Sequence, residues 1–172
     1  SISTDLSDSE WSAATSGAAA VYGSGPSCLD YSPDGDACDE AWSLNEYGRL
    51  YNWYAVNDSR GLCPAGWRVP SESDWYSMTS SLGGSSVAGE KLKSTYGWSY
   101  SGQGTNESGF NGMPGGKRQD GSGYFSSAGD RGTREGHRVH EGCSAESCWD
   151  CAGRVLPTNF SPAGSCWLKA SE

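Results

Sequence analysis

Positive charge is scarce in this sequence. Lysine and arginine together number 12, against 21 aspartate and glutamate residues, so the formal net charge is -9 at pH 7. A protein that binds nucleic acid needs a cluster of basic side chains to displace the counterions of the phosphate backbone. We therefore expect no nucleic-acid partner.

Long hydrophobic runs are also missing. No stretch approaches the roughly 18 consecutive apolar residues of a membrane-spanning helix, and no basic-then-apolar signal precedes the first residues. Apolar residues make up only 35% of the chain, whereas it contains 25 glycines and 12% aromatic residues. This composition predicts a single domain over residues 1–172 without a membrane span, in which long loops surround a core of a few large rings.

The motifs of common catalytic sites are absent as well. Both histidines, His137 and His140, lie in one short segment, and no serine has the sequence context of a nucleophile elbow. The glycine-rich runs lack the lysine-threonine ending of a phosphate-binding loop. The sequence therefore predicts neither a hydrolase triad nor a nucleotide site.

Cysteine, by contrast, is plentiful. Seven cysteines in an acidic, serine-rich chain are typical of an oxidising compartment, so we expect a secreted or cell-surface protein with disulfides. The segment 22–40 is dense in Gly, Pro and Asp and contains Cys28 and Cys38, which predicts a loop insertion tied by its own disulfide. The odd number leaves one cysteine that is free, bonded to another chain or bound to a metal.

Two helix starts have capping patterns. Ser7 is followed three residues later by Glu10, which predicts a short helix. After Pro70, Ser71 as N-cap with Asp74 at the third helical position predicts a second helix that ends at the following Gly-Gly pair. One side of this second helix carries three apolar residues: Trp75, Met78 and Leu82.

Between these helices lies a further periodic stretch. Tyr47, Leu50, Tyr51, Tyr54 and Ala55 follow helical spacing, which predicts one buried helix face or a short helix leading into a strand. Downstream of residue 83, isolated aromatic residues alternate with glycine and polar residues. That pattern predicts long ordered loops and short strands.

Four motifs in order resemble one known family, the Fibrobacter succinogenes major paralogous domain. They are "YGRLYNWYAVND", "GLCPAGWRVPSESDW", "LGGSSVAGEKLKS" and "TNESGFNGMPGGKR", and the resemblance runs from about Trp11 to Phe125. That family is similar to the formylglycine-generating-enzyme-like branch of the C-type lectin fold. The resemblance implies an α+β, C-type-lectin-like domain with two short helices, a small twisted antiparallel sheet and long ordered loops, stapled by disulfides.

The resemblance also implies specific pairings. In this family the cysteine of the "CPxGW" motif, here Cys63, is expected to bond a cysteine in the last strand, which by position is Cys166. Family members begin with a strand upstream of the equivalent of Ser1, and without it a sheet edge would be open. An open edge invites pairing with another chain, so a homo-oligomer or filament is one possible assembly.

Metal sites and an enzyme are alternatives to a plain binding domain. Cys143, Cys148 and Cys151 are either disulfide-bonded or, with the two histidines, zinc ligands. The segment "CSAESCWDCAGR" also resembles the copper(I) site of formylglycine-generating enzymes, which would make Cys143 and Cys148 redox ligands of an oxidase. The usual calcium-dependent sugar motifs of lectins, Glu-Pro-Asn and Trp-Asn-Asp, do not occur. An acidic loop offers possible calcium ligands, at Asp30, Asp34, Asp36 and Asp39.

Surface recognition is the function that the sequence favours. Aromatic rings and guanidinium groups in glycine-rich loops either contact a ligand or cap the core. The candidates for ligand contact are Trp98, Tyr100, Arg118, Tyr124, Arg131 and Arg134. We expect a non-catalytic binding or assembly domain, such as an adhesin or fibre subunit without a cofactor, whose partner is itself, an extracellular protein or a glycan. The alternatives are a copper-dependent oxidase and a carbohydrate-binding module.

Overall fold

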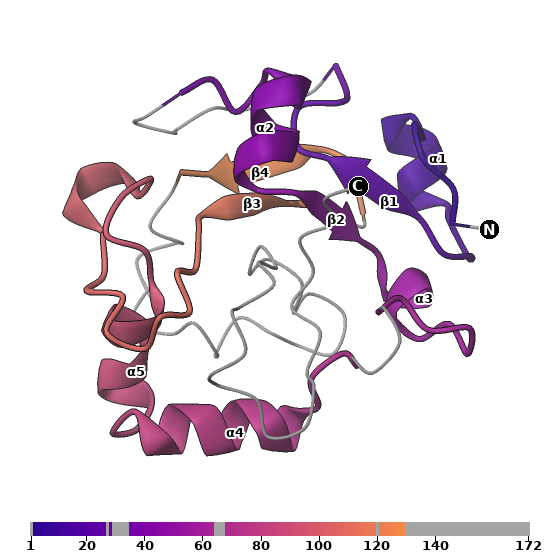
Figure 1. Cartoon of the computed structure of the whole chain (residues 1–172). Coiled ribbons are helices and arrows are strands. Elements are labelled where there is room, and N and C mark those ends of the chain that lie inside the picture. Colours follow the sequence, from indigo (N-terminus) through magenta and orange to yellow (C-terminus); the bar gives the residue numbers. More distant parts are fainter. Residues whose placement is uncertain (1, 27, 29–34, 64–67, 120, 130–172) are drawn as a thin grey trace.

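The computed structural model describes residues 2–26, 28, 35–63, 68–119 and 121–129 (Figure 1). The elements within these ranges are α1 (Asp8–Ser12), β1 (Ala19–Val21), α2 (Glu40–Glu46), β2 (Arg49–Tyr51), α3 (Trp53–Val56), α4 (Glu72–Ser81), α5 (Ser85–Leu92), η1 (Ser99–Ser101), β3 (Gly115–Arg118) and β4 (Phe125–Ala128). No helix in this part of the chain is long and apolar enough to cross a membrane.

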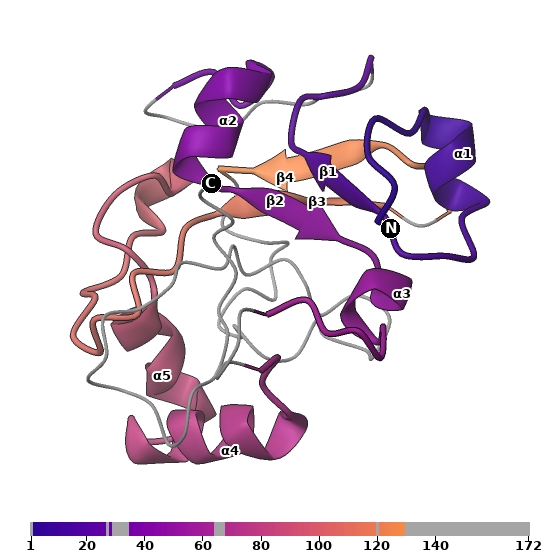
Figure 2. The same ribbon diagram turned by 45° about the vertical axis from the view of Figure 1, so that its right-hand side comes forward.

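Two small antiparallel strand pairs form the centre of the fold. β1 pairs with β2, so that Ala20 lies opposite Leu50, and β3 pairs with β4, so that Arg118 lies opposite Phe125. The two pairs lie next to each other in both Figure 1 and Figure 2, with α2 on one side and α4 and α5 on the far side. The predicted mixed α+β class is confirmed, whereas a lectin-like arrangement stays a prediction.

The expectation of two helices and one small sheet was wrong. The described ranges contain five α-helices and two separate two-stranded sheets. The helix α5 was missed because its N-cap, Gly84, makes no side-chain cap hydrogen bond. Its buried residues Ala88 and Leu92 pack against Phe110 instead, so a contact far along the chain supports it.

Both capping predictions are confirmed. In α1 the Glu10 amide donates to Ser7 Oγ at 3.3 Å, and Glu10 Oε2 accepts from the Ser7 amide at 2.8 Å. In α4 the Asp74 amide donates to Ser71 Oγ at 3.3 Å, and Asp74 Oδ2 accepts from the Ser71 amide at 2.7 Å. These local bonds satisfy amide groups that have no partner inside the helix, which fixes where each helix begins.

The periodic stretch from residue 47 is not one helix. Tyr47, Leu50 and Ala55 are buried as expected, but Tyr54 is 46% exposed. The side chain of Asn52 accounts for the break between β2 and α3. Its Oδ1 accepts from the amide of Ala55 at 3.0 Å, so Asn52 caps a new helix directly after the strand.

Apolar residues gather in two clusters. The larger one lies around the strand pairs, and its buried members are Trp11, Ala18, Ala20, Tyr22, Ala37, Tyr47, Leu50, Met113, Phe125 and Ala128. The smaller one joins α5 and Phe110 to the partly buried residues of α4: Trp75, Met78 and Leu82. The predicted apolar side of α4 therefore faces this second core.

The edge of β1 is occupied near the start of the chain. The Ser3 amide donates to the carbonyl oxygen of Gly17 at 2.9 Å, and the Ser3 carbonyl oxygen accepts from the Ala19 amide at 2.9 Å. This parallel bridge covers the edge of β1, all of whose residues are buried. The edge of β1 is therefore occupied at this position, and assembly through an open sheet edge stays a prediction.

One predicted disulfide is confirmed. Cys28 and Cys38 are bonded, with their Cα atoms 5.8 Å apart. Cys63 is disulfide-bonded too, but its expected partner Cys166 lies outside the described residues. A formed disulfide is consistent with an extracellular, oxidising location.

Candidate functional site

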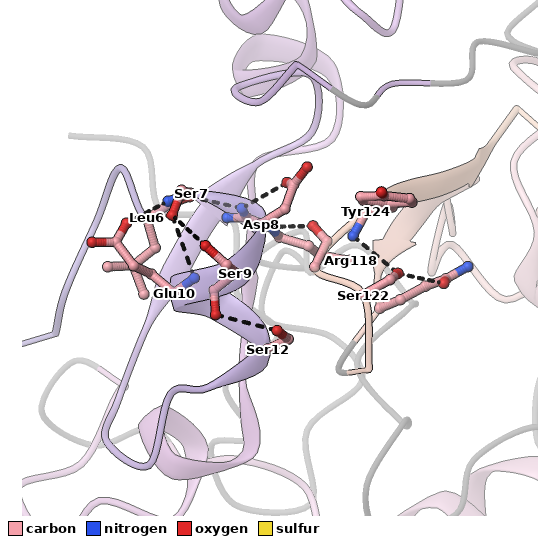
Figure 3. A network of polar contacts seen from close by, with 11 residues as sticks. Leu6, Ser7, Asp8, Ser9, Glu10, Ser12, Arg118, Ser122 and Tyr124 are labelled. Atoms are coloured by element: carbon pink, nitrogen blue, oxygen red, sulfur yellow. Dashed lines mark hydrogen bonds and ion pairs between the residues drawn. The ribbon is translucent and has the colours of Figure 1, made fainter.

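Arg118 does not face the solvent. Its side chain is only 1% exposed, and it lies between α1 and the β3–β4 pair (Figure 3). Its Nε donates to the carbonyl oxygen of Gly123 at 2.9 Å, and its Nη2 donates to the carbonyl oxygen of Leu6 at 2.7 Å and to Asp8 Oδ1 at 3.3 Å. The guanidinium is therefore held by groups of the protein itself.

Two aromatic rings enclose the same guanidinium. Its central carbon lies 4.6 Å from the centroid of the Trp11 ring and 4.7 Å from that of Phe125. Burial lowers the pKa of Arg118, and the hydrogen bond and charge of Asp8 act in the opposite direction. We call Arg118 with Trp11, Phe125 and Asp8 the arginine clamp. Because its cation is enclosed, the structure places Arg118 in the core and not on a ligand-binding surface.

Tyr124 lies beside this clamp but points outward, with 52% of its surface exposed. Its amide donates to Ser122 Oγ at 3.3 Å (Figure 3). Tyr124 directly precedes β4, in the segment that joins the two strands. It therefore remains accessible, whereas the guanidinium of the neighbouring Arg118 is enclosed.

Trp98 and Tyr100 belong to another surface, the segment of residues 94–105 between α5 and β3, which we call the aromatic loop. Trp98 is partly buried. Its Nε1 donates to Ser94 Oγ at 2.9 Å, and the ammonium of Lys93 lies 4.9 Å from the centroid of its ring. Trp98 therefore forms part of the base of the loop.

Hydrogen bonds fix the aromatic loop at both ends and in the middle. The Ser94 amide donates to the carbonyl oxygen of Gly112 at 2.9 Å, and the Gly104 amide donates back to the carbonyl oxygen of Ser94 at 2.8 Å. In the middle, the Ser99 amide donates to the carbonyl oxygen of Gly129 at 2.6 Å. The loop is thereby tied to itself and to the residue that follows β4.

Tyr100 stands out on this loop by its conformation. Its backbone has φ 54° and ψ 35°, and the next residue, Ser101, has φ 61°. Left-handed backbone is rare for residues other than glycine and costs a bulky residue about 1–3 kcal/mol. The Tyr100 side chain is nevertheless 67% exposed, so burial of the ring in the core does not explain the cost.

The remaining exposed side chains of the loop are uncharged. Residues 94–106 contain no Asp, Glu, Lys, Arg or His. The exposed positions are Thr95, Tyr96, Tyr100, Ser101, Gln103 and Thr105. Tyr96 is 42% exposed, although nothing in the sequence distinguishes it from a buried ring. The loop thus presents two phenol rings among hydroxyl and amide groups.

The structure separates the candidates for ligand contact into two groups. Tyr124 precedes β4, whereas the aromatic loop meets Gly129, which follows it. These two points lie at opposite ends of β4. Arg131 and Arg134 lie outside the described residues. Among the predicted residues that the structure describes, only Trp98 and Tyr100 therefore share one site.

The candidate calcium ligands have local roles. Asp36 Oδ1 accepts from the Cys38 amide at 2.9 Å, and Asp39 caps α2 by accepting from the Trp42 amide at 2.9 Å. Asp30 and Asp34 lie outside the described residues. In the ranges that the structure describes, no group of three or more His, Cys, Asp or Glu side chains could hold a metal ion.

The remaining candidates for metal binding or redox chemistry all lie outside the described residues. They are His137, His140, Cys143, Cys148 and Cys151. The zinc and copper hypotheses therefore stay predictions.

These features define a mixed α+β domain, tied by a disulfide, that presents an aromatic surface loop. The chain matches the Fibrobacter succinogenes major domain over residues 22–133. It therefore belongs to this family, as the four motifs predicted. No curated protein and no solved structure matches the chain significantly.

Proposed function

We propose that this protein is a non-catalytic extracellular domain that recognises a ligand through the aromatic loop. The observation that carries the proposal is the exposure of Tyr100 in a left-handed conformation. Backbone strain of this kind persists only where the surrounding structure imposes it, and it concentrates at binding and active sites. The hydrogen bonds from Ser94, Ser99 and Gly104 supply that constraint here.

A fixed loop has an energetic advantage in binding. Ordering a loop on association costs free energy, so a loop that is already fixed retains more of its contact energy as affinity. Tyrosine suits such a surface because it offers a large amphipathic ring with few rotatable bonds, and serine and glycine add adaptable hydrogen bonding. The aromatic loop combines these residue types, and the disulfide of Cys28 with Cys38 is consistent with work outside the cell.

A binding panel tests this proposal. The labelled domain would be applied to printed neutral and acidic oligosaccharides, to immobilised collagen and fibronectin, and to immobilised copies of itself. We expect at least one class to be bound by the wild type. A Tyr96→Ala/Tyr100→Ala variant should bind it at least about tenfold more weakly, since exposed aromatic anchors dominate such contacts.

The matched control is Tyr76→Ala. Tyr76 is a 71% exposed tyrosine on α4, outside the aromatic loop. The Tyr76→Ala variant should bind each class as tightly as the wild type does. If no class is bound, or if the loop variant binds every class as well as the wild type does, the proposed function is wrong.

A further inference from the structure

We infer that the ligand of the aromatic loop is an uncharged oligosaccharide. This inference rests on the proposed function and adds the chemical class of the ligand. It follows from three properties of the site: the absence of charge, the pairing of exposed rings with hydroxyl and amide groups, and the small apolar area.

The absence of charge excludes ligands that need ion pairs. Within a chain of net charge -9, residues 94–106 contain no charged side chain. The lysines that flank the loop are engaged: the Lys93 ammonium donates to the carbonyl oxygen of Gly102, and Lys91 pairs with Glu107 at 3.1 Å. In the ranges that the structure describes, a sulfated or uronic-acid-bearing glycan would therefore meet only lysines that already have a partner within the protein, and the net charge of the chain would repel it.

The exposed groups match the two faces of a neutral sugar. A pyranose presents an apolar C–H face and a rim of hydroxyl groups. The rings of Tyr96 and Tyr100 offer apolar faces with a polar end, and both are well exposed. The Ser101 hydroxyl and the Gln103 amide can each donate and accept hydrogen bonds, as sugar hydroxyls require. Two rings on one loop favour an oligosaccharide over a single sugar.

In the described part of the chain, the loop exposes only two large rings, those of Tyr96 and Tyr100, which argues against a protein partner. A stable protein interface buries roughly 800 Å² on each side around a central group of large apolar residues. In the described part of the chain, the other large exposed apolar residues lie outside the loop, on α3, α4, α5 and beside β4: Trp53, Tyr54, Tyr76, Val87 and Tyr124. Two tyrosine rings suit a sugar chain better than a protein surface.

Titration calorimetry and an oligosaccharide array test this inference together. The probes are neutral gluco-, xylo-, manno- and galacto-oligosaccharides, with uronic-acid-bearing and sulfated oligosaccharides beside them. We expect binding to at least one neutral oligosaccharide and weaker binding to the acidic ones. The affinity for the neutral oligosaccharide should be the same at about 50 and 500 mM salt, because the contact contains no ion pair that salt could screen. Treatment with a chelator should leave this affinity unchanged too.

Two variants locate the binding on the loop. Tyr100→Asn removes the ring and introduces a residue that tolerates the left-handed backbone. A loss of binding in this variant can therefore be assigned to the missing ring and not to a disturbed fold. It should weaken binding of the neutral oligosaccharide at least about fivefold. Tyr76→Ala should leave binding unchanged.

The outcomes separate this inference from the proposed function. Loop-dependent binding of an acidic glycan or of a protein would overturn the inference and leave the proposed function standing. Neutral-sugar binding that survives the loss of both loop rings would overturn both. Failure to bind any neutral oligosaccharide would also overturn the inference, and the protein and self-binding arms of the panel would then decide the proposed function.

Discussion

Arg118 donates a hydrogen bond to the main-chain carbonyl oxygen of Leu6 at 2.7 Å, across 112 residues of sequence. This bond joins the segment before α1 to β3, while the rings of Trp11 and Phe125 enclose the same guanidinium. The arginine clamp therefore connects the beginning of the described chain to its last strand pair.

Replacing Arg118 should destabilise the domain. Arg118→Met would remove the donor from the buried carbonyl oxygen of Gly123 and from the partly buried carbonyl oxygen of Leu6 and carboxylate of Asp8. We expect the free energy of unfolding to fall by about 2–4 kcal/mol in urea titrations. The matched control is Lys117→Met on the same strand, partly exposed, which should change it by less than about 0.5 kcal/mol. Equal effects of the two variants would show that the clamp contributes nothing specific.

Gly123 allows the strand connection to approach α1. Its φ is +73°, and a Cβ at this position would lie 2.0 Å from the carbonyl oxygen of Asp8. Gly123→Ala should therefore cost about 2–4 kcal/mol through backbone strain and overlap, which for a domain of this size lowers Tm by roughly 5–15 °C. Gly121→Ala is the control, because a Cβ there meets no atom within 4 Å. A Tm unchanged by Gly123→Ala would contradict this contact.

The disulfide of the acidic loop should contribute measurably to stability. Cys28 and Cys38 are separated by 10 positions. In the chain-entropy description, a loop of this length contributes roughly 2.5–3 kcal/mol. A Cys28→Ala/Cys38→Ala variant isolates the effect, because a reducing agent would also attack the disulfide of Cys63. Urea titration of the variant should show a free energy of unfolding lower by this amount. An unchanged urea midpoint would contradict a stabilising role of this disulfide.

The cap of α4 should make stability depend on pH. The hydrogen bonds of Arg68 and then of Ser71 hold the pKa of Asp74 well below its usual range. A carboxyl with a lowered folded-state pKa stabilises the fold above its unfolded value of about 4, and this contribution is lost as pH falls further. Asp74→Asn should therefore lower the free energy of unfolding by about 0.5–1 kcal/mol at pH 7. The difference in this free energy between the variant and the wild type should shrink between about pH 4 and pH 2.

The matched control for that experiment is Glu90→Gln, which removes an exposed carboxylate from α5. It should change stability by less than about 0.5 kcal/mol at pH 7. A gap between Asp74→Asn and the wild type that stayed constant from pH 7 to pH 2 would contradict the assigned role of Asp74.

The conformation of Tyr100 predicts a variant that keeps or gains stability while it loses the proposed ligand binding. Asparagine tolerates left-handed backbone better than tyrosine, so Tyr100→Asn should leave the free energy of unfolding unchanged or raise it by up to about 1 kcal/mol. Thermal unfolding measures this, with Tyr76→Ala as a control at a position of ordinary helical backbone. A clear loss of stability in Tyr100→Asn would mean that the ring supports the fold.

What could be predicted from the sequence depended on short-range chemistry. The caps at Ser7 and Ser71 and the bond between Cys28 and Cys38 join residues no more than 10 positions apart. The family itself was recognisable from four motifs. These signals were sufficient to predict the α+β class and two of the helices.

What could not be predicted depended on contacts distant in sequence. The sequence left Arg118 open between ligand contact and a place in the core, because nothing near it indicates that Leu6 and Asp8 will surround it. The helix α5 was missed because Phe110 supports it from outside its own segment. Tyr96 and Trp98 have the same glycine-rich context, and only the folded loop shows that Trp98 faces inward while Tyr96 is exposed.

In the aromatic loop, one set of atoms determines the conformation and another set forms the exposed surface. Its shape depends on main-chain groups and on the inward-facing side chains of Lys93, Ser94 and Trp98. Its outer chemistry depends on other positions, such as Tyr96 and Gln103. If the loop binds a ligand as proposed, substitutions at the outer positions change the ligand that is recognised and leave the loop conformation intact. This loop is then a suitable place to select new binding specificities from a library.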